Sequence, residues 1–253
     1  MRRIKRLPLN DTTLKYLAKQ QNRIDKGIEA RRCWSSAQKS KAIRCNVAGK
    51  LREMAGRRER CMYCQDSRAT EIDHFWPLSN YPQRTFCWEN LLHSCAGCNR
   101  RKTNRFELGS DGTPLLIDPT AIDPWDHLYY EPTTGMLAAR YVDGVESRLG
   151  AHTTDPEILP LNIDAITMGR QRTARSLSSA VREFLSTVDK RGVAEATSQV
   201  IQAISDHDDF GLAEWFFKRD GSTHIPFATL RANHKDAWQA VVDSLDLVTA
   251  TSS

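Results

Sequence analysis

Two cysteine pairs with the same internal spacing are the clearest candidates for chemistry in this sequence. Cys61 and Cys64 form one C-x2-C pair, and Cys95 and Cys98 form a second pair after the intervening residues 65–94. Four thiolates satisfy the tetrahedral coordination that Zn²⁺ prefers, and sites closed by four protein ligands are structural. We therefore predict a structural zinc site. The alternative is that one pair is fortuitous and its cysteines are free thiols.

An acidic residue and a histidine stand side by side between these pairs, in the stretch EIDHFWP. Asp73 offers a hard oxygen ligand for Mg²⁺ or Mn²⁺, and His74 carries an imidazole that titrates near neutral pH. A bound cation and a general base could together promote hydrolysis of a phosphodiester bond. Asn99 offers a second oxygen ligand just after the second cysteine pair. The alternatives are a buried histidine satisfied by its neighbours and an asparagine that caps a helix.

A small folded unit must position these groups, and the segment between the cysteine pairs predicts one. Residues 70–75 have the composition of a short strand, residues 90–92 predict a second, and a helix is expected to begin near Ser94. Neighbouring residues on a regular strand face opposite ways, so Asp73 and His74 can serve one phosphate only if the strand ends or twists there. A unit this short buries little apolar surface, so we expect zinc to stabilise it.

The order EIDHFWP, ENLL and CAGCNRRK resembles the HNH nuclease family, whose fold is a ββα unit around one catalytic metal. In the zinc-bearing branch of that family, cysteine pairs flank the site as they do here. The resemblance implies that His74 is the general base, that Asp73 and Asn99 bind the catalytic Mg²⁺ or Mn²⁺, and that Asn90 holds the loop that orients His74. It also implies basic residues that contact nucleic acid, namely Arg100, Arg101, Arg105 and, at the scissile phosphate, Lys102.

Charge is divided unevenly along the chain. Residues 1–60 contain 18 lysines and arginines against 5 acidic residues, residues 61–105 contain 6 against 4, and residues 106–253 contain 12 against 22. A basic surface attracts phosphate-rich partners, so the N-terminal part favours contact with nucleic acid. A solvated basic helix surface, or a docking face for an acidic protein, is the alternative.

The regions that flank the site are predicted to be largely helical, so the fold class is mostly α with a small α+β insert. We divide the chain into a basic helical N-terminal region (1–58), a zinc-stabilised ββα-metal core (59–108), a loop-rich extension (109–160) and a helical C-terminal region (161–250). Within these regions, apolar spacing and turn residues predict helices over 11–30, 36–58, 210–219 and 227–246, loops and a short hairpin within 109–160, and a frayed tail over 248–253.

The segments outside the core carry a second, looser resemblance. The stretches MRRIKRLPLNDTTLKYL, LLIDPTAIDPWDHLYYEPTTGML and PLNIDAITMGRQR are similar to the HNH component of bacterial Septu-type and retron-linked anti-phage systems, often called PtuB-like. This resemblance implies a role in antiviral defence and an ATPase partner of the SMC-like or ABC type. The expected substrate is DNA. A nuclease that cleaves RNA such as tRNA, or a zinc-stabilised module that binds nucleic acid or protein without catalysis, is the alternative.

The sequence shows neither a membrane-spanning segment nor a secretory signal, and this bears on where in the cell we expect the protein. The sequence has no run of about 18 apolar residues, which a membrane-spanning helix would need. Its basic start MRRIKRLPLND lacks the apolar stretch of a secretory signal. We therefore expect a cytoplasmic protein without a membrane partner.

Overall fold

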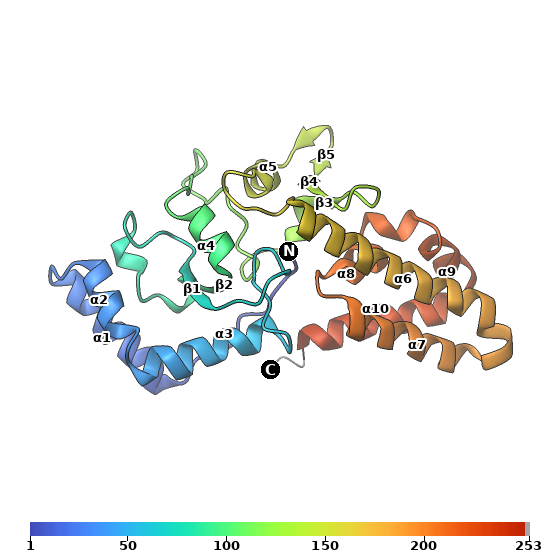
Figure 1. Ribbon diagram of the computed structural model, residues 1–253, viewed down its shortest axis with the longest axis horizontal. Coiled ribbons are helices and arrows are strands. Elements are labelled where there is room, and N and C mark those ends of the chain that lie inside the picture. Colours follow the sequence, from blue (N-terminus) through green and yellow to red (C-terminus); the bar gives the residue numbers. More distant parts are fainter. Residues whose placement is uncertain (251–253) are drawn as a thin grey trace.

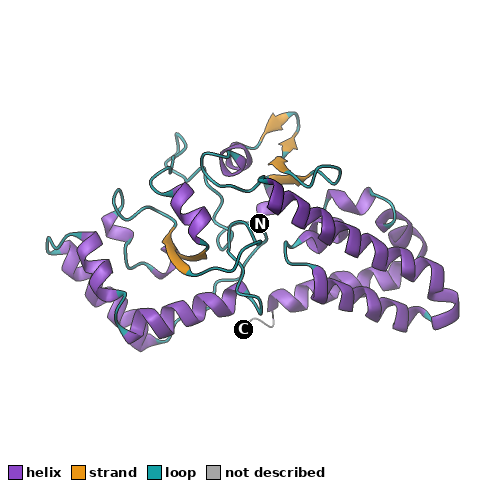
Figure 2. Ribbon diagram, viewed as in Figure 1, coloured by secondary structure: helices purple, strands orange, loops and turns teal. Residues whose placement is uncertain are grey.

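The structure is a computed structural model that describes residues 1–250, with side-chain surroundings described for residues 1–246. It has a bent outline with two lobes, one formed by the N-terminal helices around a small sheet and the other by the C-terminal helices (Figure 1). Buried apolar side chains from both lobes belong to one continuous core. Helices dominate the described chain and the sheets are two-stranded (Figure 2), so the predicted fold class is confirmed.

The basic N-terminal region contains three helices joined by tight turns. Helix α1 (Asp11–Asp25) begins at Asn10, whose side chain accepts a hydrogen bond from the Thr13 amide at 2.8 Å. It ends earlier than the predicted 11–30 because Gly27 turns the chain with a φ of 94°. The helix predicted over 36–58 is also corrected. The structure has α2 (Ala30–Ala37), and after a turn a π-helical segment (Ala42–Val47) continues into α3 (Ala48–Ala55).

The two predicted strands and the helix after them form a ββα unit. Strand β1 (Glu71–His74) pairs antiparallel with β2 (Leu91–Ser94), and Asp73 lies opposite Leu92 in the register. Helix α4 (Ala96–Lys102) follows directly, with Cys95 at its N-cap. The loop between the strands contains two short 3₁₀ turns, Pro82–Arg84 and Trp88–Asn90.

The extension from residue 109 to 160 contains more regular structure than its composition predicts. Strands β3 (Leu128–Tyr130) and β4 (Leu137–Ala139) form the expected hairpin, and β5 (Tyr141–Val142) pairs with β6 (Val145–Glu146). Helix α5 (Arg148–Thr154) was not predicted, because it is short and its residues include glycine and three of low helix propensity. A 3₁₀ turn (Pro124–Asp126) precedes β3.

The C-terminal lobe is a bundle in which α6 (Asp164–Arg191) and α7 (Val193–His207) pack side by side (Figure 1). Helix α8 (Leu212–Lys218) agrees with the predicted segment 210–219 and is followed by a 3₁₀ turn, Asp220–Thr223. The single helix predicted over 227–246 is wrong, since a break at His234 (φ −135°, ψ 64°) divides it. It comprises α9 (Phe227–Asn233) and α10 (Lys235–Ala250).

The remaining sequence predictions about organisation have mixed outcomes. Helix α10 extends to Ala250, and residues 251–253 of the tail predicted to be frayed lie outside the described residues. The division into four regions stays a prediction. Within the described part of the chain, every helix is too short or too polar to cross a membrane.

Candidate active site

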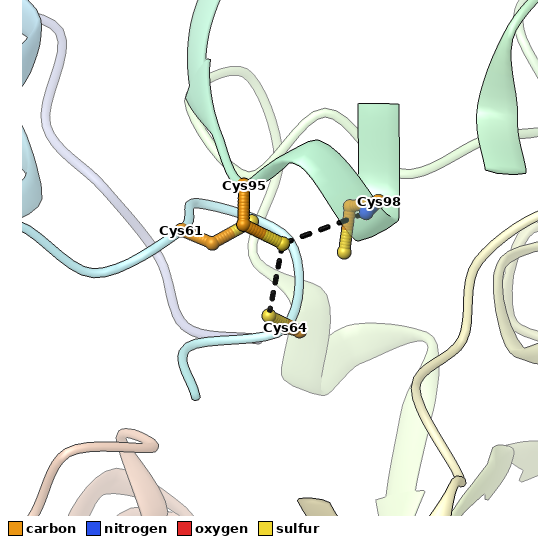
Figure 3. Close-up of side chains that lie close together, drawn as sticks. All are labelled: Cys61, Cys64, Cys95 and Cys98. Carbon is orange, nitrogen blue, oxygen red and sulfur yellow. Dashed lines mark hydrogen bonds between the residues drawn. The ribbon is translucent and has the colours of Figure 1, made fainter. Parts of the chain in front are cut away.

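The four paired cysteines come together in one buried cluster, as the sequence predicts. Their Sγ atoms all lie within 4.8 Å of one another, and Figure 3 shows the side chains converging from two segments of the chain. Cys61 and Cys64 lie on the turn that precedes β1, whereas Cys95 caps α4 and Cys98 lies in its first turn. The Cys64 and Cys95 sulfurs are 3.9 Å apart, which is too long for a disulfide bond.

The geometry of this cluster fits a tetrahedral metal. Four sulfurs bound at about 2.3 Å around one Zn²⁺ stand roughly 3.8 Å from each other, which is close to the spacing observed here. Burial, followed by hydrogen bonds from neighbouring thiols, raises the pKa of Cys61 well above its ordinary value. Several thiolates can share this buried space only when a cation balances their charge. The residues present therefore suit a structural metal ion of the kind predicted.

His74 lies at the end of β1 and is almost completely buried. Its ring packs edge-on against Trp34, with 4.4 Å between ring centroids, and its Nε2 lies 3.0 Å from the Thr85 carbonyl oxygen. A carbonyl can only accept a hydrogen bond, so Nε2 must carry the proton and Nδ1 holds the lone pair of the neutral ring. Burial lowers the pKa of His74 to about 4, the Thr85 hydrogen bond opposes this shift, and the charge of Lys102 adds to it. The imidazole is therefore neutral at neutral pH, which is the form that a general base requires.

Asn90 ties together the loop that holds His74. Its Oδ1 accepts a hydrogen bond from the Trp76 amide at 2.7 Å. Its Nδ2 donates to the carbonyl oxygens of Trp76 and Arg84, at 3.1 and 2.9 Å. Arg84 directly precedes Thr85, whose carbonyl orients the imidazole. These contacts are the ones that a loop-holding role would need.

Asp73 is held by two buried partners on the side of the sheet that faces α4. The Tyr63 hydroxyl donates to Asp73 Oδ2 at 2.7 Å, and the Lys102 ammonium lies 3.3 Å from Oδ1 and 3.2 Å from Oδ2. Lys102 also donates to the His74 carbonyl oxygen at 2.7 Å, and its side chain has no exposed surface. The resemblance to HNH nucleases implies that Lys102 contacts the scissile phosphate. We revise that role, because α4 directs this side chain inward to balance the charge of Asp73.

Asn99 contacts a carboxylate that the sequence analysis missed. Its Nδ2 donates to Glu71 Oε2 at 2.7 Å, so its Oδ1 is the atom left for a ligand. Glu71 lies two residues before Asp73 on β1, and both side chains reach α4, whereas His74 packs toward Trp34 and the loop. The period of two along a strand was the signal that could have identified Glu71.

The three arginines expected to contact nucleic acid lie at the surface around α4. Arg100 is exposed. Arg101 and Arg105 both approach Glu157, with nitrogen–oxygen distances of 3.6 Å in each pair. Exposed pairs of this length contribute little to stability and can be exchanged for a phosphate. Their contact with nucleic acid stays a prediction.

Comparison with known proteins bears on the segment that contains these residues. Residues 61–105 match a family described as HNH endonuclease. A stretch of 74 residues is 35% identical to the Septu protein PtuB of Bacillus thuringiensis. That match covers 27% of this chain and 27% of the relative, so the chain aligns with about a quarter of the length of the curated protein. The matched segment 61–105 includes both cysteine pairs and every candidate catalytic residue.

Proposed function

We propose that this chain, whose residues 61–105 match the HNH endonuclease family, is a metal-dependent endonuclease that hydrolyses phosphodiester bonds in DNA. The observation that carries the proposal is the environment of His74. Its imidazole is kept neutral by burial and is oriented by the Thr85 carbonyl, within a loop that Asn90 holds. A buried imidazole needs a hydrogen-bond partner in any role, but this partner also places the proton on Nε2 and leaves the lone pair on Nδ1, as a general base requires.

Two metal ions would have separate tasks in this proposal. The four cysteines would hold a structural Zn²⁺ that stabilises the ββα unit. Asp73 and Asn99 provide oxygen atoms from β1 and α4, the donor type that Mg²⁺ and Mn²⁺ prefer. When bound there, the ion would stabilise the charge that develops on the phosphate.

The remaining chemistry belongs to side chains of the protein. His74 would take a proton from the attacking water at Nδ1, while its Nε2–H stays on the Thr85 carbonyl. Tyr63 and Lys102 fix the carboxylate of Asp73, and Glu71 holds the Nδ2 of Asn99, which leaves its Oδ1 for a ligand. Arg100, Arg101 and Arg105 would bind neighbouring phosphates of the substrate.

We also propose a role in anti-phage defence with an ATPase partner of the SMC-like or ABC type. The support is the similarity to the Septu protein PtuB, together with the basic N-terminal region, which could contact nucleic acid or the partner. RNA such as tRNA is the alternative substrate. A non-catalytic binding module is the alternative function, and the specific observation behind it is that His74 and the Lys102–Asp73 ion pair are nearly completely buried in the absence of a ligand.

The test is to offer plasmid DNA, single-stranded DNA and tRNA to the purified protein, alone and with an ATPase encoded beside it, in the presence of Mg²⁺ or Mn²⁺. We expect the parent to cleave DNA. His74→Ala should keep its bound zinc and its fold but cut about 10² to 10⁴ times more slowly. His207→Ala, a histidine substitution in the C-terminal lobe, serves as the matched control. Equal cleavage by the His74→Ala variant and the parent would exclude this mechanism, and cleavage of tRNA alone would select the RNA alternative.

A further inference from the structure

A cleft runs between the two lobes, on the side of the molecule where the chain begins. It has a volume of about 430 Å³ and lies between the N-terminal segment, the connection after α3, and helices α7, α8 and α10. We call it the seam cleft. Six basic residues line it: Arg2, Arg3, Arg57, Arg58, Arg60 and Lys218. Three acidic residues line it as well: Asp208, Asp209 and Glu214.

Part of this charge is already neutralised by partners within the protein. Arg58 and Arg60 both bind the carboxylate of Asp209, with 3.0 Å for the Arg60 pair. Lys218 binds Asp246 at 2.5 Å. Among the ion pairs of the described residues, none includes Arg2, Arg3 or Arg57. The lining thus retains positive charge that the protein itself does not balance.

Two of the acidic residues of the seam cleft already bind other groups of the protein. The carboxylate of Asp208 accepts hydrogen bonds from the Leu212 and Ala213 amides, both at 2.8 Å, at the beginning of α8. Asp209 is shared by two arginines, as described above. All three acidic residues of the cleft also act electrostatically on Arg2. Even with Asp246 counted as the partner of Lys218, six basic residues face four acidic ones, so the net charge of the cleft stays positive.

Arg2 is fixed in the cleft by glycines from both lobes. A Cβ atom added to Gly211 would lie 2.4 Å from the Cβ of Arg2, and one added to Gly56 would lie 3.1 Å from its Nη2. Arg2 Nη2 donates to the Ala55 carbonyl oxygen at 3.1 Å, at the end of α3. The side chain therefore passes between the two lobes in a space that only glycines leave open, and its guanidinium is held in place before any ligand arrives.

Three nitrogen atoms of the lining arginines are buried and have no hydrogen-bond acceptor within the described residues. They are Arg2 Nε, Arg3 Nη1 and Arg60 Nε. Buried donors without an acceptor are rare in proteins, because each has lost its water without gaining a partner. Three of them among residues that line one cleft show that its arginines carry more donors than the protein supplies acceptors.

We propose that the seam cleft binds a phosphate-bearing ligand. The planar guanidinium donates paired hydrogen bonds to phosphate oxygens, and a phosphate has enough oxygens for several arginines at once. The cleft volume is within the range of small-ligand sites. Arg57 and Arg60 precede Cys61 closely in the chain, so a bound phosphate would join the C-terminal lobe to the segment that carries the cysteine cluster.

The phosphate could belong to a free nucleotide or to the backbone of a nucleic acid, and direct binding measurements separate these sources. Full-length, zinc-loaded protein is titrated calorimetrically, without added divalent cation, with tripolyphosphate, ATP and a single-stranded 12-mer oligonucleotide. The cleft variant is Arg57→Ala, because Arg57 is exposed and removal of its side chain should not disturb the fold. The matched control is Arg182→Ala, which removes an exposed arginine from the far lobe.

We expect binding of at least one of the three ligands, weakened about tenfold or more by Arg57→Ala and unchanged by Arg182→Ala. Arg2→Met, with its fold verified by circular dichroism, should weaken binding further. Binding of tripolyphosphate and ATP assigns the site to a free nucleotide, whereas binding of the oligonucleotide, displaced by tripolyphosphate, assigns it to a nucleic-acid backbone. If none of the ligands binds, or if Arg57→Ala and Arg182→Ala bind as the parent does, the proposal is wrong.

Discussion

The cysteine cluster and the Asp73–His74 site share one ββα unit, yet their donor atoms are treated in opposite ways. The four sulfurs lie close to one another, so as thiolates they would need an external cation. Asp73 faces an internal cation, the ammonium of Lys102, and Asn99 faces Glu71. A structural metal site can therefore be predicted from its ligands alone. A site for an exchangeable ion also depends on the groups that satisfy its ligands while the ion is away.

Among the changes that test this comparison, removal of one zinc ligand should have the largest effect on stability. Cys95→Ser is expected to lose zinc and to unfold the ββα unit, since a structural zinc can contribute about 10 kcal/mol or more to folding. Elemental mass spectrometry measures the zinc content, and thermal unfolding measures the stability. Cys45→Ser is the matched control, because Cys45 is exposed and distant in sequence from the cluster. A stable, zinc-free and active Cys95→Ser protein would contradict the structural assignment.

Removal of the internal cation should have the next largest effect. Lys102→Met leaves the buried carboxylate of Asp73 without its charged partner, which we expect to reduce the free energy of unfolding by about 3–5 kcal/mol. Added Mg²⁺ or Mn²⁺ should restore part of this loss by taking the place of the ammonium. Urea unfolding with and without the ion measures both effects. Arg100→Met controls for the loss of a surface charge. A Lys102→Met protein as stable as the parent would show that the Asp73 carboxylate does not depend on the ammonium of Lys102.

The environment of His74 predicts a dependence of stability on pH. Its pKa is lowered to about 4 in the folded protein, so the unfolded chain binds the proton more tightly. The stability that depends on the neutral ring is complete above the ordinary histidine pKa of about 6.5 and is lost as the pH falls toward 4, with a full size of about 3 kcal/mol. Comparison of urea unfolding of the parent and His74→Gln between pH 4 and pH 7 isolates this contribution. Parallel curves for the two proteins would show that His74 titrates normally.

The smallest effect is expected from the carboxylate that holds Asn99. Glu71→Ala should leave the fold and the zinc intact but raise the concentration of Mn²⁺ needed for half-maximal cleavage about tenfold, because the Asn99 amide is no longer oriented. The rate at saturating Mn²⁺ should change much less. Mn²⁺ binding measured directly, by magnetic resonance, provides a reading that does not depend on activity. Glu107→Ala is the control, since Glu107 is an exposed acid outside the site.

Some features were predictable because they depend on residue type and local spacing. The C-x2-C pairs predict four sulfur ligands, and the strand composition of EIDH with the helix that begins within CAGC predicts a ββα order. Helix breaks were less predictable. The end of α1 near Gly27 and the break at His234 depend on backbone conformations that several neighbouring residues could also have adopted.

Residue types and their spacing were enough to identify the groups that could do chemistry here: four thiols for a structural metal, and an acid, a histidine and an amide for hydrolysis. The neighbours of those groups became visible only in the folded chain. Folding directed Lys102 inward to Asp73, paired Asn99 with Glu71, and buried His74 against Trp34 and the Thr85 carbonyl. The reason is that the charge state and availability of a side chain depend on neighbours brought together by folding, such as Trp34 and His74, which are far apart along the chain.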